Sequence, residues 1–278
     1  MLVHHRDNKS LFIQQEDAYD RILNRIVSTM PNNPILQGHK VYSQNLEDGI
    51  IAEIFKRIGS GNTFMEIGLQ DGTECNTLSL LLSGWRGTWI EGDDTHCQTI
   101  KNAIGATSFP GKFQVLCEFV DVSNIVALYQ QATTFFKVNE LDFFSLDIDG
   151  NDYYVIEKLL QGGKRPAVFC VEYNAKFPPP MNVKIKYNPQ HRWDLTDYQG
   201  ASLQAFADLF KMYGYTLVSC DASGINAFFV QDEKVKGFTT YDIKDLYQPP
   251  RYHLSPLYTG HAPTLRFLKE VLNDRSKP

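Results

Sequence analysis

Acidic side chains recur in this 278-residue chain at the points where apolar runs of the sequence end. The first such run, 63–67, carries Glu66 and is followed at once by Gly68, Asp71 and Gly72. The acids at or just after the ends of later runs are Glu91, Asp93 and Asp94; Asp121; Asp147, Asp149 and Asp152; and Glu172. Any one of them could cap the helix that follows it. Acids at successive run ends instead predict a carboxylate-rich ligand site, because the carboxyl ends of parallel strands meet at one sheet edge.

The turn after the first run favours a nucleotide-like ligand. A buried strand stopped by Gly-x-x-x-Gly, here Gly68 and Gly72, lets bare backbone come close to such a ligand. Glu91 lies 23 residues after Gly68, where an acid binds ribose hydroxyls in nucleotide folds. The Gly-x-Gly-x-x-Gly fingerprint of dinucleotide sites is not matched, and the charges of Glu66 and Asp71 would repel a pyrophosphate. The plainer alternatives are strand-ending glycines and a solvated loop acid.

Strand-like runs alternate with helix-like segments along the chain and predict an α/β fold. The parallel candidates are 63–67, 87–91, 113–120, 142–148 and 167–172. Because these runs are apolar rather than alternating, they are typical of parallel strands covered on both faces. Two further runs, 215–219 and 225–230, are joined by a short Asp-Ala-Ser-Gly turn that is typical of a hairpin. We therefore predict a seven-stranded, mainly parallel sheet with helices on both faces and an antiparallel last strand.

The remaining segments divide the chain into three predicted parts. Residues 1–40 form an N-terminal helical arm, with a helix near 16–27 closed by a Pro-Asn-Asn-Pro breaker. The ligand-binding domain spans 41–235, and its long insert at 175–200 is expected to lie over the substrate site. The tail, 236–278, carries a predicted helix at 263–273. The arm and the tail each offer a surface for a homodimer contact.

The composition is that of an ordinary globular protein and excludes some partners. With a net charge of -5 and a pI of 5.8, the chain lacks the basic field that nucleic-acid binding needs. No apolar run approaches the roughly 18 residues of a membrane span, and the first residues lack the apolar core of a secretory signal. The five cysteines are scattered, and Cys117 and Cys170 lie in apolar runs. We therefore predict free thiols in a reducing compartment and a soluble cytoplasmic protein.

Several motifs taken together resemble a known family. The matching segments are Tyr42-Ser-Gln-Asn-Leu-Glu-Asp48, Phe64-Met-Glu-Ile-Gly-Leu-Gln-Asp-Gly72, Trp89-Ile-Glu91 and Ser145-Leu-Asp-Ile-Asp-Gly-Asn-Asp152. In this order they are similar to the FkbM-type S-adenosylmethionine-dependent methyltransferases, over about residues 40–232. The resemblance implies the class I, Rossmann-like methyltransferase fold and S-adenosylmethionine as the cofactor.

The resemblance also implies which residues contact that cofactor. The expected contacts are Glu66 and Gly68 on the methionine side, Glu91 at the ribose, Asp121 with Val122 beside the adenine, and Asp71, Gly72 and Asp147. S-adenosylmethionine carries a sulfonium and an α-ammonium and no phosphate, so a carboxylate-rich edge suits it. One departure is Gln70, which replaces the middle glycine of the general class I pattern.

A second acidic centre lies at the predicted fourth and fifth strand ends. Asp147, Glu172 and Asn174 could hold a hard divalent cation such as Mg²⁺ through their oxygens. The full calcium-binding loop pattern of an EF-hand is absent. In the metal-free alternative, Asp147 contacts the cofactor and Asp149 orients the acceptor.

The insert supplies candidates for the acceptor side. His191 is the first candidate for the general base, with Asp149 as the second, and a loop histidine bonded to backbone is the plain alternative. Aromatic and amide side chains of the insert could bind a sugar ring, or could anchor the loop to the protein body. Its basic residues, Lys176, Lys184, Lys186 and Arg192, hint at an anionic acceptor, although a solvated charged face is commoner.

These observations predict an S-adenosylmethionine-dependent O-methyltransferase that acts on a hydroxyl of a sugar or glycan precursor, with or without a divalent metal. A polyketide or another secondary metabolite is the alternative acceptor. The rival classes are a Rossmann-like cofactor-binding module without catalysis and an NAD-linked sugar enzyme. The NAD reading would need the glycine fingerprint that is missing here.

Overall fold

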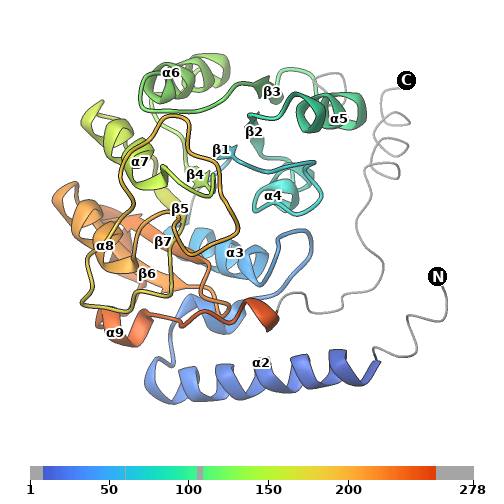
Figure 1. The fold of residues 1–278 in the computed structure, drawn as a ribbon. Helices are drawn as coiled ribbons and strands as arrows, with labels where there is room; N and C mark the ends of the chain where they lie inside the picture. Colours follow the sequence, from blue (N-terminus) through green and yellow to red (C-terminus); the bar gives the residue numbers. More distant parts are fainter. Residues whose placement is uncertain (1–8, 60, 105–108, 255–278) are drawn as a thin grey trace.

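A twisted sheet forms the centre of the molecule in the computed structural model, which describes residues 9–59, 61–104 and 109–254 (Figure 1). Its strands are β1 (Thr63–Ile67), β2 (Arg86–Glu91), β3 (Phe113–Cys117), β4 (Phe143–Leu146), β5 (Val168–Glu172), β6 (Tyr215–Cys220) and β7 (Asn226–Gln231). In the described residues the sheet has seven strands in the order β3-β2-β1-β4-β5-β7-β6. The pairs among β1 to β5 are parallel, whereas β7 runs antiparallel to both β5 and β6. The predicted fold class is therefore confirmed.

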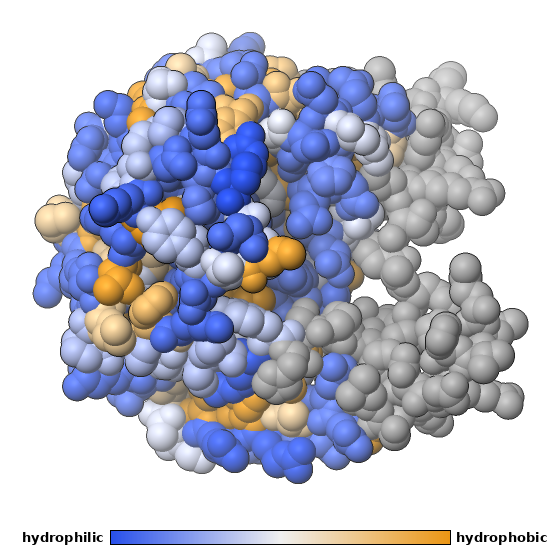
Figure 2. Space-filling view, viewed as in Figure 1, coloured by the Kyte–Doolittle hydropathy of each residue, from blue (hydrophilic) through white to orange (hydrophobic). Residues whose placement is uncertain are grey.

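Helices cover both faces of this sheet, as the apolar strands predict. The helices are α2 (Lys9–Thr29), α3 (Glu47–Ile58), α4 (Leu78–Leu82), α5 (Asp94–Ile104), α6 (Ile125–Phe136), α7 (Asp152–Gln161), α8 (Leu203–Met212) and α9 (Ile243–Leu246), with short 3-10 turns η1 (Pro34–Gln37), η2 (Asp232–Gly237) and η3 (Tyr252–Leu254). One core cluster joins α6, α7 and α8 to Met65 and Ile67 of β1, while a second joins α2, α3, α4 and α5 to Phe64. Successive β1 side chains thus enter opposite cores, because side chains alternate along a strand. Hydrophilic residues cover most of the face shown in Figure 2, with hydrophobic ones scattered among them.

The strand register brings the functional ends of the strands to one edge. Ile67 of β1 lies beside Ile90 of β2 and beside Leu146 of β4, and Leu146 lies beside Val171 of β5. The turns after these strands therefore meet at the same edge. Because β7 is antiparallel, it begins at this edge, where Asn226 pairs with Glu172.

The N-terminal helix α2 is longer than the predicted 16–27 and packs into the body of the protein. Tyr19, Ile26 and Met30 are buried in the core cluster that contains α3. The Tyr19 hydroxyl and the Ser223 hydroxyl form a buried 2.7 Å hydrogen bond. The domain boundaries at 40 and 235 and the homodimer stay predictions. The predicted helix at 263–273 lies outside the described residues.

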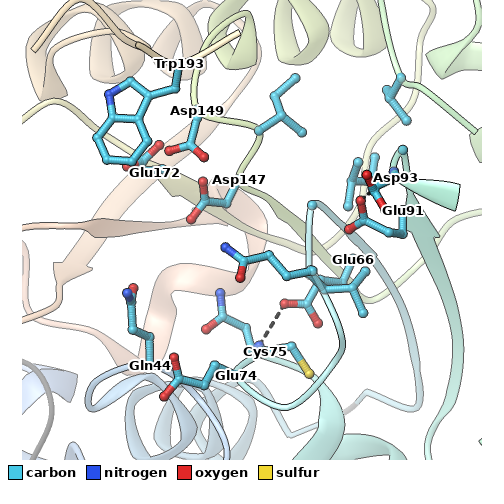
Figure 3. A pocket seen from close by; sticks show the side chains of 18 of the residues that line it. Gln44, Glu66, Glu74, Cys75, Glu91, Asp93, Asp147, Asp149, Glu172 and Trp193 are labelled. Atoms are coloured by element: carbon cyan, nitrogen blue, oxygen red, sulfur yellow. Dashed lines mark hydrogen bonds between the residues drawn. The ribbon is translucent and has the colours of Figure 1, made fainter. Parts of the chain in front are cut away.

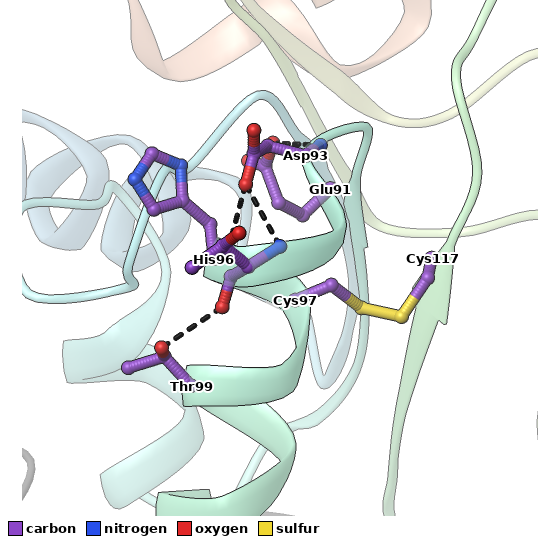
Figure 4. The surroundings of a disulfide bond; sticks show 7 residues. Glu91, Asp93, His96, Cys97, Thr99 and Cys117 are labelled. Atoms are coloured by element: carbon purple, nitrogen blue, oxygen red, sulfur yellow. Dashed lines mark hydrogen bonds between the residues drawn. A yellow bond between two sulfur atoms is a disulfide. The ribbon is translucent and has the colours of Figure 1, made fainter.

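The cysteines differ in part from the free thiols predicted above. Cys97 of α5 and Cys117 of β3 form a disulfide, which ties α5 to the end of β3 (Figure 4). Cys75, Cys170 and Cys220 are free and buried. The prediction was wrong for the bonded pair because the two residues stand 20 positions apart, with no local spacing to signal the bond. Disulfides persist in oxidising compartments, so the cysteines no longer support a reducing one, and a cytoplasmic location stays a prediction. Within the described ranges, no helix has the length and apolar character to cross a membrane.

Candidate functional site

A cavity of about 810 Å³ opens at the carboxyl edge of the parallel strands (Figure 3). Its walls come from the turns after β1, β2, β3, β4 and β5, from the start of β7 and from the insert between β5 and α8. In Figure 3, Glu91 and Asp93 lie on one side of the cavity, while Asp149, Glu172 and Trp193 lie on the other. The cavity therefore has two ends of different composition.

The turn after β1 passes unusually close to the turn after β4. Gly68 has a positive φ of 82°, and a Cβ placed there would lie 1.7 Å from the Asp147 carbonyl oxygen. Only glycine is compatible with both conditions. Gln70 follows with φ 52°, a left-handed conformation that is uncommon for a residue with a side chain. This turn therefore holds strained backbone against the cavity.

Of the two residues predicted in this turn, Asp71 and Gly72, only Asp71 lines the cavity. Asp71 lines the cavity, and its Oδ1 accepts hydrogen bonds from the Thr73 backbone N–H and hydroxyl. Gly72 does not line the cavity; a Cβ there would approach the Trp89 ring at 3.1 Å. Gly72 thus allows the turn to pack on β2 rather than exposing backbone to a ligand.

Glu66 lines the cavity wall but uses its carboxylate inside the protein. Its Oε1 accepts from the Asn76 N–H at 2.7 Å, and its Oε2 accepts from the Thr77 N–H and hydroxyl. Burial raises the pKa of Glu66 to about 7, although these hydrogen bonds oppose the shift. Glu66 therefore holds the 73–77 loop in place, and its oxygens are already occupied.

Glu91 ends β2 with one carboxylate oxygen available. Its Oε1 accepts from the Asp93 N–H at 2.8 Å, while its Oε2 has no hydrogen-bond partner among the described residues. The side chain is only 8% exposed and lines the cavity. A ligand hydroxyl can therefore donate to Oε2 without displacing an internal bond.

The turn after β3 departs from the prediction by a few residues. β3 ends at Cys117 rather than at residue 120, so the cavity is lined by Glu118, Phe119 and Val120. Asp121 and Val122, predicted beside the adenine, do not line it. The Asp121 carboxylate accepts from the Ser123 N–H and hydroxyl ahead of α6, and the hydroxyl bond lowers the Asp121 pKa. At this edge the cavity is therefore lined by the residues just before the two predicted ones.

Three carboxylates gather at the opposite end of the cavity. One ligand oxygen from each of Asp147, Asp149 and Glu172 lies within 4.8 Å of the others. Burial raises the pKa of all three, and their mutual repulsion adds to the shift for Asp147 and Glu172. Asp149 has φ 53°, so the backbone is strained where this acid enters the cavity. Such a group can share protons or hold a cation.

Two polar residues near this cluster have other roles. Asp152 accepts from the Ile148 and Gly150 N–H groups at the start of α7, and burial raises its pKa to about 6. Asn174 does not line this cavity, because its amide donates to the Asp197 and Gln199 carbonyls within the insert. The structure therefore does not bring Asn174 together with the predicted metal ligands, and Asp149 takes its place.

The insert is fastened to α7 and places His191 over the acids. The Asn151 amide donates to the Asn188 carbonyl at 2.7 Å, and the His191 N–H donates to the same carbonyl at 2.9 Å. A Cβ on Gly150 would lie 2.3 Å from His191 Cδ2, so the ring packs directly on this glycine. His191 Nε2 is buried without a hydrogen-bond partner in the described structure. Its charge also lowers the Asp149 pKa, in opposition to burial, so the two predicted bases lie close together.

Most of the other insert residues that were singled out face elsewhere. Trp193 and Arg192 line the cavity, and the Arg192 guanidinium carbon lies 4.2 Å from the centre of the Phe119 ring. The insert thereby reaches the β3 side of the cavity. The Lys184 ammonium instead lies 3.6 Å from the centre of the Tyr153 ring. The aromatic and basic residues in or next to the insert that do not line this cavity are Tyr173, Phe177, Tyr187, Tyr198, Lys176, Lys184 and Lys186.

Several lining residues were not predicted from the sequence. Among them are Gln44, Gln199, Asn226 and Tyr252. Gln44 lies in the first matching motif, 42–48, for which no ligand contact was predicted. Asn226 could have been found from the predicted antiparallel strand, since such a strand begins at the edge where its parallel neighbours end.

Comparisons with known proteins do not assign the chain to a family. No family model matches the chain, and no curated protein matches it. The chain is similar to a putative caffeoyl-CoA O-methyltransferase from Staphylococcus aureus (TM-score 0.49, 12% identity, 79% of this chain and 99% of that one). It is also similar to the N-terminal domain of EvdMO1 with SAH bound (TM-score 0.44, 10% identity, 76% of this chain and 94% of that one). A third similar structure is an O-methyltransferase from Bacillus cereus in complex with SAH (TM-score 0.42, 14% identity, 75% of this chain and 89% of that one). The FkbM subtype is not identified by these likenesses, and the function is inferred below from the chain's own residues.

Proposed function

We propose that this chain is an S-adenosylmethionine-dependent methyltransferase that transfers a methyl group to a hydroxyl of a sugar or glycan precursor. The observation that carries the proposal is the composition of one cavity. It combines Glu91, with a free carboxylate oxygen, and a distant cluster of Asp149, Glu172 and His191. A nucleoside fits the first end, and proton transfer from an acceptor fits the second.

The end of the cavity at Glu91 supports S-adenosylmethionine as the methyl donor. Glu91 Oε2 can accept from the ribose hydroxyls, while Phe119 and Val120 offer an apolar wall for the adenine. The acids of the β1 and β4 turns favour the positive charges of the sulfonium and the α-ammonium. The same acids would repel the pyrophosphate of a dinucleotide, which argues against the NAD-linked alternative.

The second end supports the transfer. The acceptor oxygen, the methyl carbon and the sulfur must lie in line, and holding that geometry supplies most of the rate gain. The oxygen–carbon bond forms as the carbon–sulfur bond breaks, and the electron pair of that bond stays on the sulfur as a thioether. His191 Nε2 has no hydrogen-bond partner among the described residues and can accept the hydroxyl proton through its lone pair. Asp149 is the second candidate for this general base.

The acid cluster also fits a divalent cation. Asp147, Asp149 and Glu172 would hold it, since a hard cation prefers oxygen ligands and would relieve the repulsion that raises their pKa values. Such a cation supplies a lower pKa for the acceptor hydroxyl. In the metal-free form, His191 and Asp149 perform the deprotonation by themselves.

Calorimetry followed by methyl transfer tests the proposal. We expect the purified chain to bind S-adenosylmethionine and S-adenosylhomocysteine (SAH) and not NAD⁺. Incubation with methyl-labelled S-adenosylmethionine and a sugar panel should then give labelled sugar, and EDTA with Mg²⁺ add-back decides whether a metal assists. Absence of binding to both sulfur ligands would refute the proposal. Binding without transfer to any acceptor would favour a non-catalytic module.

A further inference from the structure

The acceptor end of the cavity contains hydrogen-bond acceptors that have no donor. Three buried atoms on described residues that line the cavity lack a hydrogen-bond partner: His191 Nε2, Gln199 Oε1 and Asn226 Oδ1. All three residues line the cavity. Buried polar groups are almost always hydrogen-bonded, and such exceptions call for an explanation such as an absent ligand. A ligand that donates hydrogen bonds would satisfy all of them.

Asn226 is the best fixed of the three. It is 4% exposed and lies beside Glu172 in the sheet. Its side-chain nitrogen donates to Glu47 Oε1 at 3.0 Å, and its backbone N–H donates to Asp221 Oδ1 at 2.6 Å. If the amide turned over, its oxygen would face the Glu47 oxygen and this hydrogen bond would be lost, so the amide nitrogen stays on Glu47 and does not face the cavity. The oxygen is therefore presented as a permanent acceptor.

Glu47 is in turn held by residues away from the cavity. Its Oε2 accepts from the Asn45 N–H at 2.7 Å, and its Oε1 accepts from the Asn45 amide at 3.2 Å. The Asn45 side-chain oxygen Oδ1 also accepts a hydrogen bond from the Ser223 hydroxyl at 3.1 Å. Neither Asn45 nor Glu47 lines the cavity. Asn226 is thus the one member of this buried chain that can contact a ligand.

The charge at this end disfavours an anion. Arg192 is the single Lys or Arg among the described lining residues, and its guanidinium lies over Phe119, on the β3 side. The remaining basic residues of the insert do not line the cavity. A phosphate or carboxylate here would meet Asp149 and Glu172, and no lysine or arginine of the described lining lies on this side to offset their charge. Tyr252 is 42% exposed and lines the same cavity, so its aromatic ring offers a flat surface for a sugar ring.

We propose that this end of the cavity selects an uncharged, hydroxyl-rich acceptor, and that Asn226 is the residue that determines this specificity by accepting from one of its hydroxyls. The inference rests on the proposed methyltransferase function and replaces the anionic acceptor expected from the insert's lysines. The proposed methyl donor, S-adenosylmethionine, stays the same.

Binding of simple sugars in the presence of saturating SAH tests the proposal. The probes are methyl glycosides of neutral hexoses, the matching uronic acids and the matching hexose 6-phosphates, measured by saturation-transfer NMR with and without Mg²⁺. We expect neutral members to bind at least about tenfold tighter than their charged counterparts. Equal or tighter binding of the anionic members would overturn the proposal, as would failure of every neutral member to bind a chain that binds SAH. Failure to bind SAH would instead refute the proposed function.

Variants separate Asn226 from its network. Asn226→Ala should weaken neutral-sugar binding by about tenfold, the loss expected for one hydrogen bond, with SAH affinity within twofold of wild type. Asn45→Ala is the matched control, since it also removes a donor to Glu47 but does not line the cavity. If both variants weaken sugar binding equally, or Asn226→Ala leaves it unchanged, Asn226 does not determine specificity. The wild-type panel decides the charge preference even if a variant fails to fold.

Discussion

Replacing Glu91 with glutamine would test the ribose contact with little disturbance of the fold. The glutamine carbonyl oxygen can still accept from the Asp93 N–H, which is the internal bond that shapes this turn. The free Oε2 becomes an amide nitrogen, which donates instead of accepting. Glu91→Gln therefore removes the one feature that binds a ribose hydroxyl and keeps the side-chain volume.

The expected loss follows from the charge and burial of Glu91. A hydrogen bond to a charged group contributes about 1.5–3 kcal/mol, and the 8% exposure of Glu91 leaves little water to compensate. This corresponds to roughly a 10- to 150-fold rise in the SAH dissociation constant, measured by isothermal titration calorimetry. Asp94→Asn is the matched control, because it removes a charge from the start of α5 at a residue that does not line the cavity. An SAH affinity within twofold of wild type for Glu91→Gln would refute the ribose assignment.

Three further predictions concern stability and catalysis. The pKa values of Glu66 and Asp221 are raised by burial to about 7 from 4.5 and 3.8. The folded state therefore binds more protons than the unfolded state between about pH 4 and 7, so stability falls as pH rises through this window and stays low above it. Each group should lower the free energy of unfolding by on the order of 3 kcal/mol. The unfolding midpoint in calorimetry should therefore drop by roughly 5–10 °C or more between pH 5 and pH 8. A rising midpoint would contradict this. Reduction of the Cys97–Cys117 disulfide, which closes a 20-residue separation, should cost about 3 kcal/mol and lower the midpoint by roughly 5–10 °C. The Cys97→Ser/Cys117→Ser double variant should show no response to reductant, and a wild type that is equally insensitive would argue against the bond. His191→Ala should lower kcat by about 100- to 10,000-fold at unchanged SAH affinity, and full turnover across pH would assign the proton transfer to another group.

The fold could be predicted from the sequence because its strands are buried on both faces. Runs such as 63–67 and 167–172 are mostly apolar, with one acid each, and the short turn at 221–224 indicates the hairpin of β6 and β7. The order of the strands was not predicted, since it depends on packing between distant segments. The Cys97–Cys117 bond was missed for the same reason, because α5 and β3 come together only in the folded sheet.

The site could be predicted where a residue type and its place at a strand end decide its position. Asp71, Glu91, Asp147, Asp149 and Glu172 all line the cavity as that argument requires. The prediction failed where a strand end was misplaced. The apolar residues Phe119 and Val120 extended the predicted third strand too far, so the expected contacts were assigned to Asp121 and Val122, in the turn before α6.

Residues whose roles depend on partners could not be assigned from the sequence. Glu66 is the same residue type as Glu91, yet its oxygens are occupied by the 73–77 loop. Asn226 has no neighbouring motif, and its importance comes from the contact with Glu47, which is 179 residues away in the chain. A hydrogen-bond network of this kind is a property of the folded molecule and has no local pattern.

A crystal structure of the chain with SAH would test the central claim most directly. We predict density for one SAH in the cavity, with its ribose hydroxyls within hydrogen-bond distance of Glu91 Oε2, its adenine against Phe119 and its sulfur directed towards the end that holds Asp149 and His191. Density for SAH elsewhere on the molecule, or in the reverse orientation with the adenine among the carboxylates, would contradict the account.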